Sequence, residues 1–293
     1  MPNTPTLRAL VTGSTGFIGT HLVRHLHAAG WTVATLSRRP AENAFLYTGQ
    51  TTEVMDALET FQPTVVFHLA SLFLAQHIPD QVEPLISANI LLGTQLLEAM
   101  RAAGTPALVN AGTAWQNYDG GAYLPVNLYA ATKQAFEDIL LYYTETAPLR
   151  AVTLKLYDSY GPRDTRRKLL RILLDCHRTS EPLGMSGGEQ TLDLAHVDDI
   201  CSAFLHAATL ALDPEQPRNA TYTVSGGQRR TLREVVETLE AVTGHNLPIT
   251  WGARPYRDRE VMIPWAGPSL PGWHPSIPLP DGLRALLAAE GVA

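Results

Sequence analysis

Cysteine is scarce and long apolar runs are missing from this 293-residue sequence. The two cysteines, Cys176 and Cys201, are too few for a disulfide framework and lack metal-ligand spacing, so we expect reduced thiols and no bound metal. No apolar run approaches the roughly 18 residues that a membrane-spanning helix needs, and no signal-peptide pattern is visible. We therefore expect a cytoplasmic protein without a membrane partner.

An excess of positive charge is missing as well. The formal net charge is −6 and the pI is about 5.9, which argues against a nucleic-acid partner or an anionic-membrane surface. The chain is long enough to bury a sizeable core, in one large domain or in two closely joined ones. Prolines accumulate from Pro255 to Pro280, which predicts an irregular C-terminal segment wrapped on a preformed body.

Buried-strand and amphipathic-helix patterns alternate through the first 160 residues. This order predicts an α/β protein with a Rossmann-type doubly wound parallel sheet and a smaller C-terminal substrate lobe. We expect a dinucleotide-binding domain over residues 1–160, to which residues 192–224 partly return, and a substrate lobe from 161–191 and 225–293. Strands are expected at 7–12, 32–37, 65–69, 107–111, 151–156, 222–225 and 248–251, and helices at 53–61, 86–102, 165–178 and 232–243, with another that begins with the segment 192–199 and runs to 210.

The first strand runs directly into the loop Gly13-Ser-Thr-Gly16-Phe-Ile-Gly19, which a helical pattern follows. A strand, a glycine-rich turn and a helix in this order are the context of a dinucleotide-binding loop. Gly13 permits the tight turn, Gly16 lets the backbone approach a pyrophosphate, and Gly19 permits close helix packing beside the free N–H groups of the helix N-terminus. A glycine turn without a ligand is the alternative. Further cofactor contacts are expected from the loop and from nearby strand ends, at Thr15, Phe17, Ile18, Leu69, Ala70, Ser71 and Leu156.

The second strand ends in Ser37-Arg38-Arg39, where an NAD-binding unit has an acidic residue. That acid bonds the ribose 2′-hydroxyl of NAD, whereas two guanidinium groups can hold a 2′-phosphate. We therefore expect NADP(H) as the cofactor, bound in part by Ser37, Arg38 and Arg39. Two solvated surface arginines are the alternative interpretation.

A hydroxyl, a phenol and an ammonium follow the strand at 107–111. Thr113 stands where a parallel strand delivers its last side chains into a cleft, and Tyr129 and Lys133 are four residues apart in an alanine-rich helical run. Lys133 should lower the pKa of Tyr129 from about 10 and make proton exchange feasible near neutrality. Alone, Tyr-x-x-x-Lys is a weak pattern, because any amphipathic helix can carry it.

Four further polar residues have structural interpretations. His68 falls within a strand and is expected to be a packed core residue. Asn89 is the odd polar member of an apolar helix, and we expect it to bond backbone near the active strand. Asp198 and Asp199 look like a metal pair, but they suit the N-cap and first turn of a helix better.

The order of these motifs resembles that of the extended short-chain dehydrogenases/reductases. The resemblance covers about residues 7–245 and rests on Gly13-x-x-Gly16-x-x-Gly19, Thr113, Tyr129-x-x-x-Lys133, Tyr160-Gly161-Pro162 and His196-Val-Asp198-Asp199. Such proteins mostly act on nucleotide-linked sugars. The strings at 112–116 and 158–166 look most like those of CDP-abequose and CDP-paratose synthases, which reduce a 4-keto-6-deoxyhexose.

The resemblance implies a role for each central residue. Tyr129 would be the acid/base, Lys133 would bond the nicotinamide ribose, and Thr113 would bond the reacting oxygen. Substrate contacts are expected from Ser71, Thr113, Asp158, Lys168, Arg254 and Arg257, although each of the last three can equally be a solvated charge.

The sequence departs from the family pattern at three positions. The family often has Asn where Asp158 stands, and Arg where Lys155 and Leu192 stand. The arginine at the last position commonly holds a substrate phosphate. Without it, the pyrophosphate must rely on other cations, for which the candidates are Lys168, Arg254 and Arg257.

These residues favour NADPH-dependent reduction of the 4-keto group of a CDP- or dTDP-linked 4-keto-6-deoxyhexose. An epimerase or dehydratase with bound NAD is the alternative, and a catalytically silent NADP-binding protein is a third class. Dehydratases of the family carry an acidic pair just after the threonine, where this chain has Ala114 and Trp115. The fold commonly pairs helices from two subunits, so a homodimer is expected by analogy.

Overall fold

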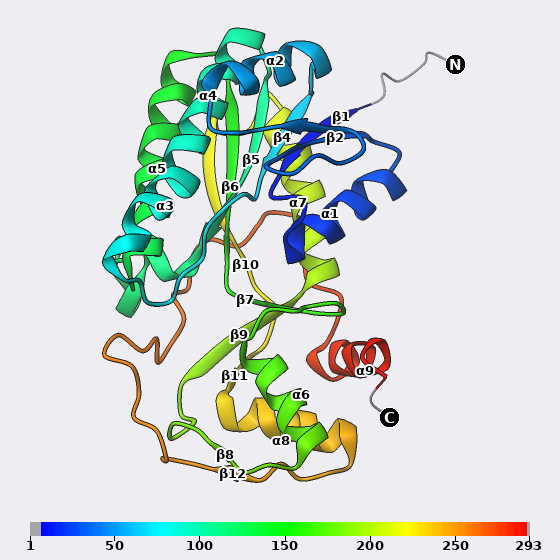
Figure 1. Ribbon diagram of the computed structural model, residues 1–293, viewed down its shortest axis with the longest axis vertical. Coiled ribbons are helices and arrows are strands. Elements are labelled where there is room, and N and C mark those ends of the chain that lie inside the picture. Colours follow the sequence, from blue (N-terminus) through cyan, green and yellow to red (C-terminus); the bar gives the residue numbers. More distant parts are fainter. Residues whose placement is uncertain (1–6, 292–293) are drawn as a thin grey trace.

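A seven-stranded parallel sheet forms the larger part of the computed structural model, which describes residues 7–291 (Figure 1). Its strand order is β10-β6-β5-β4-β1-β2-β3, and every neighbouring pair is parallel. This order confirms the predicted Rossmann-type doubly wound sheet. The strands are β1 (Arg8–Thr12), β2 (Thr32–Ser37), β3 (Ala44–Leu46), β4 (Val65–His68), β5 (Ala107–Thr113), β6 (Arg150–Leu156) and β10 (Asn219–Val224).

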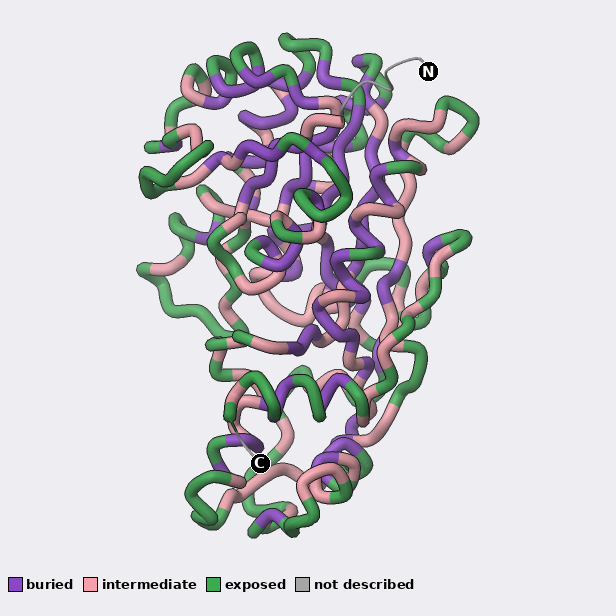
Figure 2. The backbone as a smooth tube through the Cα atoms, turned by 90° about the vertical axis from the view of Figure 1, so that its right-hand side faces the viewer, coloured by how far each residue is buried: buried purple, intermediate pink, exposed green. Residues whose placement is uncertain are grey.

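Helices cover both faces of this sheet. One face carries α1 (Phe17–Ala28) and α7 (Val197–Leu212), whose apolar side chains share a core with the strands. The other face carries α2 (Thr51–Phe61), α4 (Leu92–Ala103) and α5 (Leu128–Thr146). Buried residues concentrate between these two layers (Figure 2), as they must where strands are covered on both sides.

The predicted helix at 86–102 is part of a longer helical run with an irregular middle. It comprises α3 (Val82–Ile86), a π-helical turn (Ser87–Leu91) and α4. A π-helical turn is typical of a place where a side chain must be redirected. Here the turn buries Asn89, which lies among the residues that follow β4. The remaining short 3-10 turns are Pro79–Gln81, Ala114–Gln116 and Tyr118–Gly120.

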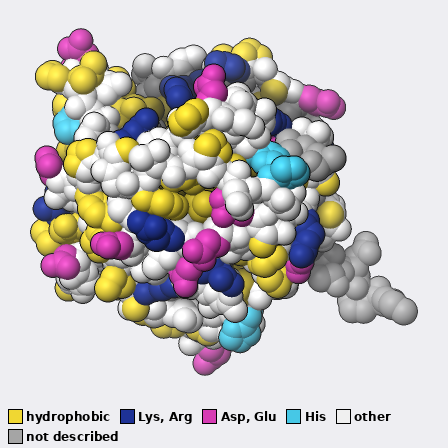
Figure 3. All heavy atoms as spheres, turned by 90° about the horizontal axis from the view of Figure 1, so that it is seen from below, with side chains coloured by type: hydrophobic (Ala, Val, Ile, Leu, Met, Phe, Trp, Pro, Cys, Tyr) yellow, Lys and Arg dark blue, Asp and Glu magenta, His cyan; other side chains and the backbone are white. Residues whose placement is uncertain are grey.

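A smaller lobe lies below the large sheet in Figure 1. It has a three-stranded sheet of order β11-β9-β7, a two-stranded sheet and its own apolar core, in which Leu173, Val235 and Leu283 are fully buried. Charged side chains of both signs are interspersed on the face seen from below (Figure 3). The lobe's elements are β7 (Asp158–Tyr160), α6 (Leu169–Thr179), β8 (Leu183–Gly184), β9 (Thr191–His196), β11 (Arg229–Thr231), α8 (Leu232–Thr243), β12 (Ile249–Thr250) and α9 (Leu279–Ala289).

The chain crosses between the two parts several times. After β9, α7 and β10 return to the large sheet, while β9 itself pairs with β7 in the lobe. The segment after β12 then runs up the left side of Figure 1 to the large sheet. On that path Arg259 donates to the carbonyls of Pro125 and Val126 at 2.9 and 3.1 Å, and Pro268 accepts from Thr223 N at 2.7 Å. The division into two domains stays a prediction.

Three expected elements differ from the structure. Residues 191–196 form strand β9, and the helix starts only at Val197, because alternate side chains of β9 face opposite layers. The predicted helix at 165–178 begins at Leu169. The proline-rich C-terminal segment is irregular only up to Pro278, after which α9 begins with proline in its first turn, where no N–H is needed.

One part of the membrane expectation, the lack of a spanning helix, can be compared with the structure. Within residues 7–291, no helix has both the length and the apolar character required to cross a bilayer.

Candidate functional site

The glycine loop between β1 and α1 is too tightly folded to hold larger residues. Gly13 has φ +72°, and a Cβ there would lie 2.6 Å from Ala70 N. A Cβ on Gly19 would lie 2.1 Å from the Gly13 carbonyl oxygen, so Gly19 lets the helix turn fold against the loop itself. Gly16 is the N-cap and supplies no side-chain acceptor for the N–H groups of the first turn. These features fit a phosphate-bearing dinucleotide.

The carboxyl ends of β1 and β4 meet at the point where the strand order reverses. Thr12 Oγ1 accepts from Ala70 N at 3.1 Å and lies 2.8 Å from His68 Nδ1. His68 is fully buried against Phe136, which confirms that it is a core residue. Burial, and secondarily the charge of Lys133, lowers the pKa of His68 to about 3, so the ring is neutral.

The arginines after β2 are exposed. Arg38 and Arg39 follow Ser37, whose hydroxyl accepts from Arg39 N at 3.2 Å. Within residues 7–291 neither guanidinium takes part in a salt bridge, so both are available to an anion. Their role at a ribose phosphate stays a prediction.

Helix α5 brings Tyr129 and Lys133 onto one face. The helix starts after Asn127, whose side chain accepts from Ala130 N at 2.9 Å as an N-cap. Lys133 is buried with 1% exposure, whereas Tyr129 is a half-buried residue. Thr113, the last residue of β5, is 8% exposed, and its Oγ1 accepts from Trp115 N at 3.3 Å. Its hydroxyl hydrogen is therefore free to be donated to a ligand oxygen.

The expected lowering of the tyrosine pKa was wrong for this structure. Burial raises the pKa of Tyr129 to about 12, and the opposing contributions come from Ser71 and Arg166 rather than from Lys133. Burial also lowers the pKa of Lys133 to about 8, which Glu137 partly offsets. Near neutrality the phenol is protonated and the lysine is a poorly solvated cation.

Glu137 is a residue of this site that the sequence interpretation missed. It stands one helical turn beyond Lys133, accepts from Gln116 Nε2 at 2.9 Å and lies 3.9 Å from Lys155 Nζ. Burial raises the pKa of Glu137, and Lys155 and Lys133 oppose the rise. The spacing of 133 and 137 on one helix face is the signal that could have identified it.

Asn89 holds the residues after β4, as predicted. Its Oδ1 accepts from Leu72 N at 2.7 Å and from Ser71 Oγ at 3.0 Å, and its Nδ2 donates to Thr132 Oγ1 at 2.9 Å. Asn89 therefore connects the segment with Ser71 to the helix that carries Tyr129. Leu156 lies at the end of β6, in register with Thr113.

Charged side chains from the lobe face the same region. Burial raises the pKa of Asp158, while the positive charges of Lys168, Arg166 and Arg257 oppose the rise. Burial also lowers the pKa of Lys168. Arg254 lies instead beside β8, near Gly184, so the structure does not bring it to Asp158.

An aromatic group that sequence reasoning did not identify adjoins Tyr129. The Phe73 ring lies 5.0 Å from the Tyr129 ring and 5.5 Å from the Trp115 ring, and Lys168 Nζ is 5.1 Å from the Phe73 ring centre. Phe73 remains 43% exposed, so its outer face is available to a ligand. The sequence around Phe73 has no motif that marks this position.

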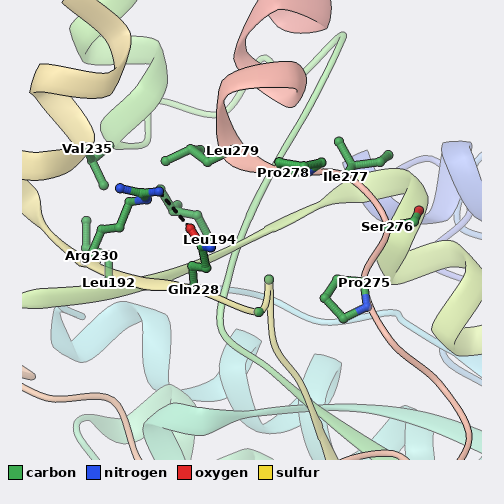
Figure 4. Close-up of a pocket in the computed structure, with 12 residues that line it drawn as sticks. Leu192, Leu194, Gln228, Arg230, Val235, Pro275, Ser276, Ile277, Pro278 and Leu279 are labelled. Carbon is green, nitrogen blue, oxygen red and sulfur yellow. Dashed lines mark hydrogen bonds between the residues drawn. The ribbon is translucent and has the colours of Figure 1, made fainter. Parts of the chain in front are cut away.

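A separate pocket of about 280 Å³ lies in the lobe, between β9, α8 and the start of α9 (Figure 4). Leu192 and Leu194 line it together with Val235, and the Arg230 side chain reaches it and donates to Gln228 Oε1 at 2.7 Å. None of the predicted site residues lines this pocket.

The acidic pair after β9 is structural. Both acids lie in the first turn of α7, as predicted, but the N-cap is His196. Asp198 lies 2.9 Å from His25 Nε2, and Asp199 accepts from Ser276 N at 3.0 Å and from Ile277 N at 3.0 Å. Among residues 7–291, no group of three or more His, Cys, Asp or Glu side chains is placed to hold a metal.

Comparison with known proteins agrees with the motif order. Residues 9–223 match the NAD dependent epimerase/dehydratase family. The CDP-abequose synthase of Yersinia pseudotuberculosis is 28% identical over 268 residues, covering 88% of this chain and 92% of that protein. The UDP-glucose 4-epimerase of Mycolicibacterium smegmatis is 30% identical over 261 residues, or 79% of each chain. The Thermus thermophilus UDP-glucose 4-epimerase in complex with NAD has a TM-score of 0.77 at 27% identity, covering 98% of this chain and 100% of that one.

The family predicted from the sequence is thereby confirmed. The match spans most of the chain and includes the glycine loop, Thr113, Tyr129 and Lys133. This chain is a member of the NAD dependent epimerase/dehydratase family.

Proposed function

We propose that this protein uses NADPH to reduce the 4-keto group of a nucleotide-linked 4-keto-6-deoxyhexose. The observation that carries the proposal is the pair of exposed arginines, Arg38 and Arg39, after a strand that ends without an acid. A 2′-phosphate would pair with them, and a reductase needs an exchangeable cofactor because each turnover consumes one. Likeness to CDP-abequose synthases supports the same reaction.

The residues present suit the delivery of a proton to the substrate. When bound, the cofactor supplies the hydride that reaches C4. Tyr129, whose pKa is about 12, stays protonated near neutrality and can donate its proton to the oxygen that becomes an alkoxide. Thr113 donates a hydrogen bond to that oxygen, and Lys133 binds the cofactor ribose. The phenolate that remains regains its proton from water, so the reaction consumes one hydride and one proton.

Substrate binding is assigned to the side of the cleft formed by the lobe. Lys168 and Arg257 are two of the cations near Asp158, and we propose that they hold the substrate pyrophosphate in place of the arginine missing at Leu192. A CDP- or dTDP-linked sugar is the proposed partner. The separation of Arg254 from Asp158 makes it the weakest of the three candidate cations.

Epimerisation is the second candidate. The likeness to UDP-glucose 4-epimerases, one of them solved with NAD, favours it. Such a reaction returns the hydride to the substrate and consumes no cofactor. Dehydration has no comparable support, because Ala114 and Trp115 offer no acid for the proton transfers it requires. A catalytically silent binding protein is disfavoured because the chain keeps both Tyr129 and Lys133.

A homodimer is proposed from the outer surface of the helical layer. Leu91, Leu141 and Tyr142 are 45%, 50% and 62% exposed on the π-helical turn and α5. Exposed apolar groups on neighbouring helices are typical of a surface that pairs with a second copy. Light scattering coupled to size exclusion tests this: a mass of one chain would contradict it.

The reaction is tested with CDP- and dTDP-linked 4-keto-6-deoxyglucose and NADPH. Stoichiometric loss of the nicotinamide absorbance together with a reduced 6-deoxysugar product supports reduction. Conversion of a nucleotide sugar without net cofactor consumption would support the epimerase instead.

A further inference from the structure

Arg166 belongs to the lobe, in the segment between β7 and α6, yet it is fixed like a binding-site residue. Its Nε and Nη2 donate to the two carboxylate oxygens of Asp164, each at 2.7 Å. Nη2 also donates to Ser159 Oγ at 3.0 Å and to the Ser159 carbonyl at 3.1 Å. Within residues 7–291, Nη1 has no hydrogen-bond partner of its own. A guanidinium held on one side in this way leaves the two N–H groups of Nη1 for a ligand.

This guanidinium lies against the glycine loop. Its Cζ is 4.3 Å from the centre of the Phe17 ring, and Phe17 is the first residue of α1. A second contact ties the same segment to α1, because His21 Nε2 lies 3.0 Å from the Pro162 carbonyl. The cation therefore adjoins the helix N-terminus whose N–H groups suit a pyrophosphate.

The three neighbouring cations Arg166, Arg167 and Lys168 have different surroundings. Lys168, two residues further on, lies over Phe73 beside Tyr129. Arg167, between them, is exposed and takes part in no hydrogen bond or salt bridge among the described residues. The positive charge of Arg166 also lowers the pKa of Tyr129, which places it within electrostatic reach of the catalytic phenol.

We propose that Arg166 is a cofactor-binding residue that pairs with the pyrophosphate of the dinucleotide, opposite the N-terminus of α1. Bidentate pairing with Asp164 fixes the plane of the guanidinium, so little further ordering is required when an anion binds. Arg166 thus adds a contact from the lobe to a cofactor whose other contacts come from the large-sheet part of the protein. The proposal rests on the dinucleotide cofactor of the proposed function, but not on whether the reaction is a reduction or an epimerisation.

The test compares binding of four ligands by isothermal titration to the wild type, Arg166→Gln and the matched control Arg167→Gln. NADPH and NADH both contain the pyrophosphate, adenosine 2′-monophosphate lacks both of its phosphates, and CDP represents the substrate side. For Arg166→Gln we expect the dissociation constants of NADPH and NADH to rise about tenfold or more, as for the loss of one charge-assisted hydrogen bond. Binding of adenosine 2′-monophosphate and CDP should remain unchanged, and Arg167→Gln should resemble the wild type with all four.

Unchanged dinucleotide affinity together with weaker CDP binding would overturn the proposal, since Arg166 would then serve the substrate. Equal losses for every ligand, with a lower melting temperature, would also overturn it and make Arg166 a structural link between lobe and α1. If Arg166→Gln does not fold, the same comparison is made with Arg166→Lys. This variant keeps the positive charge and loses only the planar guanidinium with its paired N–H groups. A wild type that binds NADH but not NADPH would refute the proposed cofactor while leaving the NADH comparison valid.

Discussion

Glu137 lies one turn beyond Lys133 in α5, and its carboxylate is the group that opposes the loss of the lysine proton. Lys133 is almost fully buried, so without Glu137 the charged form of its side chain would be still less stable relative to the neutral amine. Glu137 itself is held by Gln116 and faces Lys155. The charge state of the lysine that is assigned to the cofactor thus depends on a residue that contacts neither ligand in our proposal.

Glu137→Gln should therefore move the alkaline limit of activity to lower pH. Lys133, with a pKa of about 8, carries its proton below that pH and loses it above. Removing the carboxylate lowers this pKa, so turnover should fall more at a pH of about 8.5 than at about 6.5. A pH profile of kcat checks this, with exposed Asp138→Asn as the matched control on the same helix. If kcat falls by the same factor at every pH and the alkaline limb of the profile does not move, Glu137 has only a structural role.

Tyr129→Phe tests the proton donor. The variant should keep the fold and bind the cofactor normally, because only one hydroxyl is removed. Turnover should fall by roughly 10²–10⁴, the usual contribution of one general acid. Tyr123→Phe, on the exposed loop before α5, is the control and should keep full activity. A Tyr129→Phe enzyme with a tenth of the wild-type rate would mean that another group donates the proton.

We predict that the cofactor preference depends on Arg38 and Arg39. A charge-assisted pair contributes about 1.5–3 kcal/mol, so NADPH should bind at least about tenfold more tightly than NADH. The double variant Arg38→Ala, Arg39→Ala should lose this preference while its NADH affinity stays nearly the same. Fluorescence titration of both reduced cofactors gives the two affinities. Equal or tighter binding of NADH to the wild type is the result that this assignment does not allow.

His68 should make the fold sensitive to acid. Its pKa is about 3 in the folded protein and near the ordinary histidine value of 6.5 in the unfolded chain, so the unfolded chain binds a proton that the folded chain does not. Unfolding free energy should thus decrease as the pH falls below about 6.5, by up to about 1.4 kcal/mol per pH unit. Urea unfolding at about pH 6.5 and about pH 5 should show about 2 kcal/mol more loss for the wild type than for His68→Gln. Identical losses in the two proteins would exclude this histidine as the cause.

Local spacing explains what could be predicted from the sequence. The glycine loop and the pair Tyr129 and Lys133 are close along the chain, so their arrangement follows from one turn and one helix. The Phe73 contact with Tyr129 and the position of Arg166 over Phe17 both join segments far apart in the sequence, and the second also depends on how the lobe meets the sheet. The hydrophobic periodicity of the sequence does not indicate contacts of this kind.

Two of the three departures in secondary structure, and the pKa of Tyr129, have physical reasons. Prolines before α9 suggested an irregular segment, but Pro280 occupies a helix position that tolerates it. In β9, Asp193 is buried and accepts from Ser225 Oγ and Gly226 N, and this polar residue interrupts the apolar pattern that would indicate a strand. The pKa of Tyr129 depends on its desolvation, which is a property of the folded cleft.

The most direct test of the central claim is the stoichiometry of the reaction. CDP- and dTDP-linked 4-keto-6-deoxyglucose are each incubated with the wild-type protein and NADPH, and both the nicotinamide absorbance and the sugar product are measured. We predict one NADPH oxidised for each 4-keto sugar reduced, with at least one of the two nucleotides accepted. Interconversion of a nucleotide sugar without any net oxidation of NADPH would contradict the account.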